Sequence, residues 1–296
     1  MKKARMAGCF LGLIVCVGAR ATAQDYQNPF YYCTLLDQET ETIWDVEAAY
    51  VFEGSNDAPG WDDIGFIGLK ASAGLLYFET QSGGDIDLRF STDTRILQGF
   101  DGTSSGYPLS IINLDLRWDQ RFVYGWGMQF ELKPGLYSAL DDFGGSNWAI
   151  PLGIAGVRAL NEGLSVLLGL SVYPGFDRVV DPKIGLRWTP SADVELDVFY
   201  PETRLAFQLT PGLSVHAGAR FLSWLEYQME EDDPRDRLQL DENRLILGVD
   251  LHNGDYGKWT VDLGYYFDRK IDFEKVEAGV DIDDSFGISI GYKSLF

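Results

Sequence analysis

The sequence predicts an all-β fold: one transmembrane, antiparallel, up-and-down β-barrel of about fourteen strands, with twelve strands as the alternative. Three observations support this prediction. Apolar and polar residues alternate along most of the chain, long and short connections alternate between the predicted strands, and the chain ends on an alternating, aromatic strand from Ser285 to Phe296. Successive side chains of a strand point to opposite faces, so this alternation gives each strand one apolar and one polar face.

The N-terminus has the three parts of a secretory signal peptide. Lys2, Lys3 and Arg5 precede an apolar run, and Ala21-Thr22-Ala23 has the small-x-small form of a cleavage site. We therefore expect a signal peptide at 1–23, a polar periplasmic leader at 24–42 and the barrel at 43–296. Removing the four basic residues of the signal changes the net charge from −21 to −25.

Strands are predicted one after another from residue 43 to the end, and no segment has a convincing helical period. For example, Ile112, Leu114 and Leu116 alternate with Asp115 and Arg117. The predicted strands are 43–52, 64–78, 84–97, 108–119, 122–138, 147–159, 163–173, 179–189, 193–200, 203–210, 213–227, 238–252, 257–268 and 285–296.

The connections distinguish a membrane barrel from a soluble β-sandwich, in which strands also alternate. Outer-membrane barrels have short periplasmic turns and long outer loops. Here the long connections are 53–63, 98–107, 139–146, 228–237 and 269–284, and they alternate with short ones such as 120–121 and 211–212. An even strand number requires a tight outer hairpin at Tyr200–Thr203, with Pro201 in the turn. Closure of the sheet also removes exposed edges.

Aromatic residues near the ends of the predicted strands lie on the apolar face, as expected for an interfacial girdle: Trp118, Trp188, Trp259, Phe267 and Phe296. The C-terminal strand resembles the assembly signal of outer-membrane barrels, in which apolar positions such as Ile288, Ile290 and Tyr292 lead to a final Phe296. Ser294 departs from that pattern. This resemblance implies contact with the barrel-assembly machinery and a location in the outer membrane of a bacterium, with lipid as a partner.

Two longer segments carry a further resemblance. They are KIGLRWTPSADVELDVFYPETRLAFQLTPGLSVHAGARF and DLGYYFDRKIDFEKVEAGVDIDDSFGISIGYKSLF. The C-terminal half resembles an uncharacterised family of bacterial outer-membrane β-barrel, porin-like proteins, through a Trp-Thr-Pro turn, a Tyr-Pro hairpin, an Ala-Gly strand and a Phe-Asp-Arg strand end. The N-terminal half agrees with it only in pattern. The resemblance implies the fold and the location, and no activity.

The polar face of the strands is the candidate functional site, because it would line the barrel lumen. It could form a charged pore that selects solutes, or a network of paired charges that fills a wet interior. We expect the following residues to line the lumen: Asp87, Arg89, Asp93, Arg95, Asp115, Arg117, Glu131, Lys183, Arg187, Glu195, Asp197, Arg204, Arg220, Arg244, Asp250 and Asp262, together with Asp45, Glu47 and Asp85.

Passive passage of small hydrophilic solutes or ions is the leading functional hypothesis. The predicted lumen has more acidic than basic residues, so a modest preference for cations is expected, although Arg187, Arg204 and Arg220 could form a local anion site. The alternative is a non-conducting structural or surface-interaction barrel. An enzyme ranks third, because His216 and His252 are the only histidines and neither lies in a recognisable catalytic pattern.

Composition limits the remaining classes. A strongly acidic chain is not expected to bind nucleic acid, because phosphate neutralisation needs an excess of Lys and Arg. Only Cys33 remains after signal cleavage, so no intramolecular disulfide can form. No zinc, phosphate-loop or dinucleotide motif is present, so no cofactor is expected. The acidic outer loops could hold Ca²⁺ or Mg²⁺ loosely, but a solvated run of charges is the simpler interpretation. The oligomeric state is left open.

Overall fold

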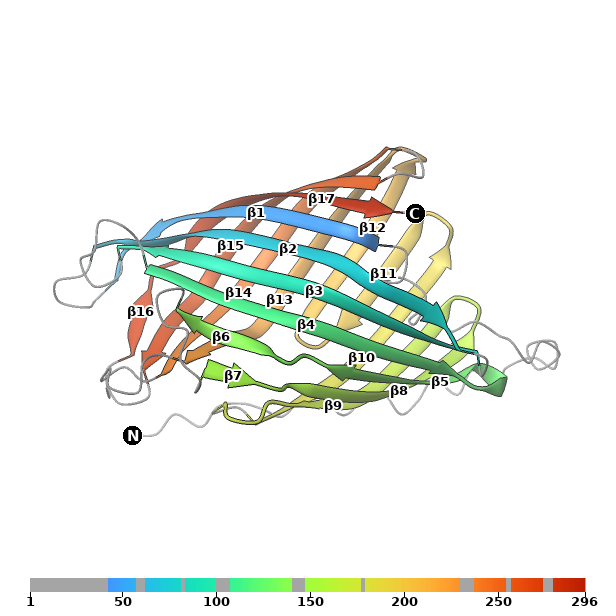
Figure 1. Ribbon diagram of the computed structural model, residues 1–296. Coiled ribbons are helices and arrows are strands. Elements are labelled where there is room, and N and C mark those ends of the chain that lie inside the picture. Colours follow the sequence, from blue (N-terminus) through green and yellow to red (C-terminus); the bar gives the residue numbers. More distant parts are fainter. Residues whose placement is uncertain are drawn as a thin grey trace, which may run out of the picture.

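The computed structural model describes residues 42–56, 62–80, 83–99, 107–139, 147–176, 179–228, 237–253, 257–273 and 279–295 (Figure 1). The predicted signal peptide, nearly all of the predicted leader, and Phe296 lie outside these residues. No helix in the described part of the chain is long and apolar enough to cross a membrane.

The strands form one closed antiparallel sheet, in which successive barrel strands pair with each other around the barrel (Figure 1). The final strand pairs with β15 on one side and with β1 on the other, which closes the barrel. The elements are β1 (Thr42–Gly54), β2 (Ile64–Glu79), β3 (Gly84–Gln98), β4 (Tyr107–Arg121), the 3₁₀ turn η2 (Val123–Gly125), β5 (Trp126–Leu132), β6 (Gly135–Ala139), β7 (Trp148–Ala149), β8 (Leu152–Asn161), β9 (Leu164–Val172), β10 (Val180–Ser191), β11 (Val194–Phe199), β12 (Glu202–Thr210), β13 (Leu213–Gln228), β14 (Arg237–His252), β15 (Gly257–Phe273), β16 (Val280–Ile282) and β17 (Ser285–Leu295).

The prediction of about fourteen strands is confirmed. The segments β5 and β6 both pair with β4, so they are two parts of one barrel strand, interrupted at Lys133-Pro134. Likewise β7 and β8 pair with β6 and β5, and they are separated at Ile150-Pro151. A proline cannot donate a ladder hydrogen bond, which explains both interruptions. The short β16 pairs with the outer end of β15, its Ile282 bridges Asn56, and it adds no barrel strand.

Two predicted strands have boundaries that differ clearly from the observed ones, and one predicted turn is confirmed. The predicted strand at 122–138 begins only at Trp126, because Val123–Gly125 form a 3₁₀ turn in which Tyr124 has a φ of 62°. The predicted strand at 257–268 continues to Phe273 through a bulge where Asp268 has a φ of 50°. The tight hairpin at Tyr200-Pro201 is confirmed between β11 and β12.

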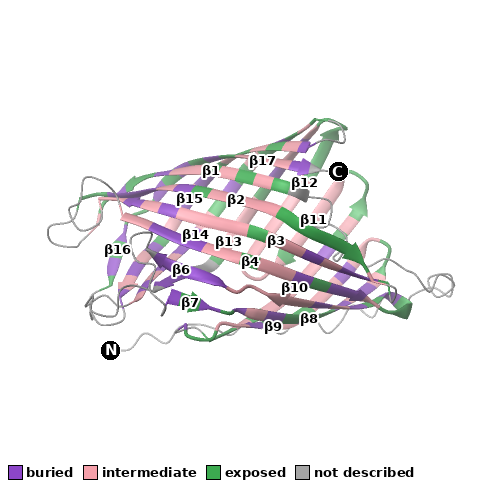
Figure 2. Ribbon diagram, in the orientation of Figure 1, coloured by how far each residue is buried: buried purple, intermediate pink, exposed green. Residues whose placement is uncertain are grey.

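The exterior of the barrel is apolar. Leu69, Phe90, Leu168, Leu247 and Ile288 point outward and are between 42 % and 68 % exposed. In Figure 2 the strands alternate along their length between more and less exposed positions. An exposed apolar surface around a closed sheet requires lipid as its solvent, so the chain is a membrane-spanning barrel of the outer-membrane type.

The two ends of the barrel differ. The start of β1, the end of β17 and the short turns lie at one end of the barrel, which is therefore the periplasmic or inner end. Strands β13, β14 and β15 have 16 or 17 residues, whereas about 9–11 residues are enough to span the membrane. Their outer ends therefore extend beyond the bilayer and are free to fold over the outer mouth.

At the outer end, β13 crosses to the opposite wall. Gln228 at the end of β13 forms a parallel bridge with Ser138 of β6. Strands β7 to β12 separate β6 from β13 around the inner part of the barrel. Because β6 and β13 meet directly at this level, the barrel narrows toward its outer end, where β13 and β14 reach across the interior.

Candidate functional site

The lumen face is the candidate site, and the ladder register places charged residues of neighbouring strands on the same face. Ladder partners such as Asp87 with Arg117, and Arg117 with Glu131, put these three side chains on the same face of neighbouring strands. Outward residues such as Phe90 and Leu114 occupy the other face, where they are exposed to lipid. The charged residues therefore line the interior.

In the inner part of the lumen, charged side chains bond sideways along the wall. Arg187 donates two hydrogen bonds to Asp197 on the neighbouring strand, at 2.6 and 2.8 Å. Lys183 of β10 forms an ion pair with Glu131 of β5 by lying over Gly153 of β8, where a Cβ would come within 2.9 Å of the ammonium nitrogen. Both ion pairs therefore run along the wall of the lumen.

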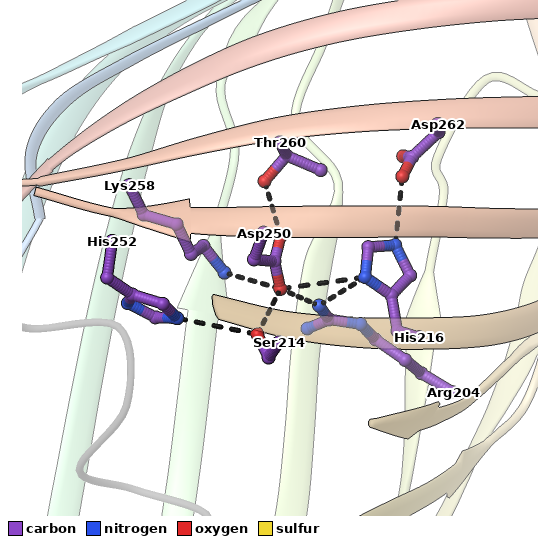
Figure 3. A network of polar contacts seen from close by, with 8 residues as sticks. All are labelled: Arg204, Ser214, His216, Asp250, His252, Lys258, Thr260 and Asp262. Carbon is purple, nitrogen blue, oxygen red and sulfur yellow. Dashed lines mark hydrogen bonds and ion pairs between the residues drawn. The ribbon is translucent and has the colours of Figure 1, made fainter. Parts of the chain in front are cut away.

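A larger polar network centres on the carboxylate of Asp250, which is 2 % exposed (Figure 3). Arg204 and Thr260 donate to its two oxygens at 2.6 and 2.7 Å, and Lys258 lies 3.6 Å away. His216 connects this network to Asp262, because its Nε2 lies 2.8 Å from the carboxylate of Asp262. Four strands, β12 to β15, supply these groups.

This network depends on a glycine between His216 and Asp262. Gly248 lies in ladder register with both residues, and a Cβ there would lie 2.0 Å from the carboxylate oxygen of Asp262 and 2.4 Å from Nε2 of His216. The histidine and the carboxylate therefore meet directly above the Gly248 backbone.

Substituting Gly248→Ala is expected to break the His216–Asp262 hydrogen bond, because both atoms must move away from the new methyl group. We expect the free energy of unfolding to fall by about 1.5–3 kcal/mol, the usual contribution of a hydrogen bond to a charged group. Urea titration of the folded barrel in detergent measures this value. Gly156→Ala is the matched control, since the nearest atom to its Cβ would be a backbone oxygen at 3.9 Å. Equal losses for both variants would contradict the expectation.

Water reaches these inner residues through the lumen. The inward side chains of Asp45, Lys70, Lys133 and Arg204 are 39 %, 32 %, 38 % and 32 % exposed. Their strands face lipid on the other side, so this exposure comes from the interior of the barrel. The inner part of the lumen is therefore a polar vestibule, by which we mean the partly exposed wall that contains these four residues.

The outer part of the lumen is filled by an apolar layer. Its members come from both walls and from the crossing strands, and each is at most 9 % exposed. We name this set the outer layer: Val51, Ile64, Phe66, Leu97, Leu109, Ile111, Tyr137, Ala149, Phe176, Tyr227, Leu238, Leu240, Tyr266, Ile271, Phe273, Val280 and Ile282. Close packing of apolar side chains excludes water, so the axial path is closed at this level.

An ion pair spans the lumen below the outer layer. Arg95 of β3 donates to Glu242 of β14 at 3.0 Å, and the two side chains are only 5 % and 4 % exposed. The ring of Phe66, a member of the outer layer, packs against two guanidinium groups, with its centroid 5.0 Å from Arg95 and 5.9 Å from Arg269. This pair joins β3 to β14, which are separated in the closed sheet by β15, β17, β1 and β2.

Most predicted lumen residues are found in pairs. Asp93 contacts Lys70 and Arg95, Arg89 contacts Asp45 and Asp87, and Asp115 contacts Lys133. Arg117 contacts Asp119, and Arg244 shares a hydrogen bond with Tyr266. Glu195 lies in ladder register with Ala206 on the lumen face.

The predicted cluster of three arginines is not formed. Arg187 binds Asp197, Arg204 binds Asp250, and Arg220 binds Glu202. Each guanidinium is held by its own carboxylate on a nearby strand. The hypothesis of a shared anion site at these residues is therefore wrong for this conformation, because opposite charges were available within one or two strands.

Several lumen residues were not predicted from the sequence, among them Lys70, Glu202, Glu242 and Lys258. Alternation did not assign Glu242 to the lumen face, because the β13–β14 and β14–β15 ladders both shift register beside it. Lys258 is next to the inner turn, where alternation is too short to assign a face. The ladder partners would have been needed to find either residue.

The C-terminal strand has the predicted faces. Ile288 and Ile290 point outward and are about half exposed, and Tyr292 lies beside Trp44 and Trp259, with ring centroids 5.1 and 4.7 Å apart. The outward Trp118, Trp188 and Trp259 are 39–47 % exposed, as expected for the girdle. Contact with an assembly machinery stays a prediction.

The histidines do not form a hydrolytic site in the described part of the chain. Ser214 lies 3.4 Å from Nε2 of His252, but the described residues place no carboxylate beside the other nitrogen of that ring. His216 is held between Asp250 and Asp262. Among the described residues, no group of three or more His, Cys, Asp or Glu side chains is arranged to hold a metal ion.

Comparison with known proteins gives similarity at the level of the barrel. No family model and no curated protein matches the sequence. Among solved structures, an outer membrane channel from Pseudomonas putida F1 is 15 % identical with a TM-score of 0.47, covering 88 % of this chain and 98 % of the other. The NanC porin is 9 % identical with a TM-score of 0.41, covering 86 % and 100 %.

A third similar structure is an enzyme. Outer membrane phospholipase A from Escherichia coli is 9 % identical with a TM-score of 0.40, and the alignment covers 87 % of this chain and 93 % of the other. Outer-membrane barrels with different activities thus match this chain to a similar degree. We therefore base the functional proposal on the geometry of the lumen.

Proposed function

We propose that the protein is an outer-membrane channel for small hydrophilic solutes, and that its outer mouth is closed in the conformation described here. The vestibule carries this proposal. A barrel that served only as an anchor would need no partly exposed charges inside, yet Asp45, Lys70 and Lys133 are each about one-third exposed to the lumen. Ion pairs that run along the wall compensate its charged side chains and leave space for water inside the barrel.

Opening of such a channel requires movement of the outer layer. The crossing ends of β13 and β14 contribute Tyr227, Leu238 and Leu240 to it. These ends extend beyond the length that the bilayer requires, so they can move without exposing unpaired backbone to lipid. An apolar constriction of this kind opens when it widens enough to admit water.

Planar-bilayer recording tests the proposal. The purified barrel is expected to show brief conducting steps separated by long closed periods, because the closed conformation is the packed one. The leader-free chain, starting at residue 42, is the control for any effect of the residues before β1. Complete absence of steps in both proteins, at any voltage that the bilayer tolerates, would contradict a channel.

The open channel is expected to prefer cations only modestly. The vestibule contains bases that the sequence prediction omitted, including Lys70, Lys133 and Lys258, and they offset much of the acidic excess. The remaining preference would come from acidic groups near the outer mouth, such as Asp62, Asp283 and Asp284. The reversal potential across a KCl gradient measures it, and it should weaken at high salt. An anion-selective sign would contradict this prediction.

A non-conducting barrel is the second candidate, and the outer layer is the observation that favours it. The layer joins side chains of strands from around the barrel into one packed cluster. If this packing never opens, the lumen stays closed at its outer end. The outer loops are then the functional surface of the protein. The same recordings decide between the two candidates.

A further inference from the structure

A lipid-facing groove lies at the inner end of the barrel, beside the turn between β4 and β5. Its volume is about 560 Å³, and its lining includes Phe122, Val123, Tyr124, Met128, Ile154 and Gly156. Phe122, Val123 and Tyr124 are each at least 50 % exposed. Gly156 leaves its floor open, because the nearest atom to a Cβ there would be 3.9 Å away. The groove is wide enough for an acyl chain and has no charged side chain in its lining.

One arginine stands at the edge of this groove on the lipid-facing side. Arg158 pairs in register with Trp126, and its guanidinium lies 4.8 Å from the centroid of the Trp126 ring. It also donates a hydrogen bond to the backbone oxygen of Tyr124. A guanidinium has five N–H donors, so these contacts leave several of them available to a ligand.

Arg158 differs from the arginines of the lumen. Arg95, Arg187, Arg204 and Arg220 each contact a carboxylate. Within the described ranges, no carboxylate lies within ion-pair distance of Arg158, which is on the outer face. An uncompensated cation facing lipid is costly unless an anion is supplied from outside the chain.

The depth of Arg158 indicates which anion is available. It lies three residues before the end of β8, which the inner turn follows. A lipid-facing arginine costs about 2–4 kcal/mol at the bilayer midplane and about 0–1 kcal/mol near the interfaces. The inner interface is where phospholipid phosphates lie, and a guanidinium binds phosphate with two parallel hydrogen bonds.

We propose that Arg158 and this groove form a binding site for one phospholipid of the inner leaflet. The headgroup phosphate accepts hydrogen bonds from Arg158, whose orientation is set by Trp126 and the Tyr124 carbonyl. One acyl chain lies in the groove over Gly156, between Met128 and Ile154. The phosphate neutralises the lipid-facing Arg158, and the acyl chain fills the groove. A single phospholipid therefore accounts for both this arginine and the apolar groove.

Native mass spectrometry of the purified barrel with added phosphatidylglycerol tests the site. The wild-type protein is expected to retain one lipid through a detergent wash. Arg158→Gln should reduce retention by about tenfold, which corresponds to about 1.4 kcal/mol. Gly156→Leu should reduce it as strongly by filling the groove while leaving Arg158 in place. Diacylglycerol, which lacks the phosphate, should not be retained.

The matched control is Ala217→Leu, which fills a second lipid-facing groove of about 480 Å³ that has no arginine in its lining. This variant should retain phosphatidylglycerol like the wild type, and a heat-modifiability gel establishes that each variant is folded. Unchanged retention by Arg158→Gln would overturn the proposal, as would equal retention of diacylglycerol. A loss with Ala217→Leu as large as with Gly156→Leu would also overturn it, because it would show general lipid adhesion.

Discussion

Replacing Glu242 with alanine is expected to destabilise the barrel by roughly 3–5 kcal/mol, the usual cost of breaking a buried ion pair by removing one of its members. Arg95 would keep its positive charge at 5 % exposure, with the carboxylate 3.0 Å away removed. The crossing strand β14 would also lose its polar connection to β3. We therefore expect both a lower free energy of unfolding in urea and more frequent conducting steps in bilayers.

Two variants make this test specific. Glu202→Ala removes a carboxylate from a sideways pair in which the side chains are 40 % and 25 % exposed, so a loss below about 1 kcal/mol and no change in conduction are expected. The double variant Arg95→Met with Glu242→Met replaces both charges by apolar side chains and should recover stability, since buried pairs often tolerate such replacement. If Glu242→Ala behaves like Glu202→Ala, the pair does not hold the mouth closed.

Shortening the β13–β14 hairpin is expected to give the largest rise in conductance. Replacing residues 224–241 by Asn-Gly joins Ser223 to Glu242, which are ladder partners, through a two-residue turn that suits a hairpin. Tyr227, Leu238 and Leu240 leave the outer layer, while the ion pair of Arg95 with Glu242 is kept. Three large buried side chains are then missing from the closed level, so steady conducting steps should replace the brief ones.

A second variant tests the opposite effect, by fixing the crossing end of β13 to β6 with a disulfide. Ser138→Cys with Gln228→Cys, in a Cys33→Ser background, places two thiols at the bridge between β6 and β13. Oxidation should abolish conduction, and reduction should restore it. A shortened hairpin that conducts no better than the wild type, or an oxidised pair that conducts freely, would show that the crossing strands do not control the mouth. The first of these results would favour the non-conducting barrel.

The fold could be predicted because it depends on local patterns. Alternation gives each strand two faces, turn residues separate the strands, and the parity of strands requires the hairpin at Tyr200-Pro201, which the structure contains. The lumen position of Arg117 and Glu131 follows from the same alternation. The boundaries that differ arise at backbone irregularities, at Tyr124 and Asp268, where alternation is interrupted and no hydrophobic period signals the change.

The sequence by itself determined that this protein is a barrel of about fourteen strands with a charged interior, because each strand carries its own two-residue period. Only the tertiary structure decided which charges meet and whether the lumen is open. Arg95 and Glu242 are 147 residues apart, and Gln228 meets Ser138 across the mouth. Such contacts depend on how far each strand extends and where the ladders shift register. These are properties of the closed sheet as a whole, because closure brings distant strands to opposite walls of one lumen.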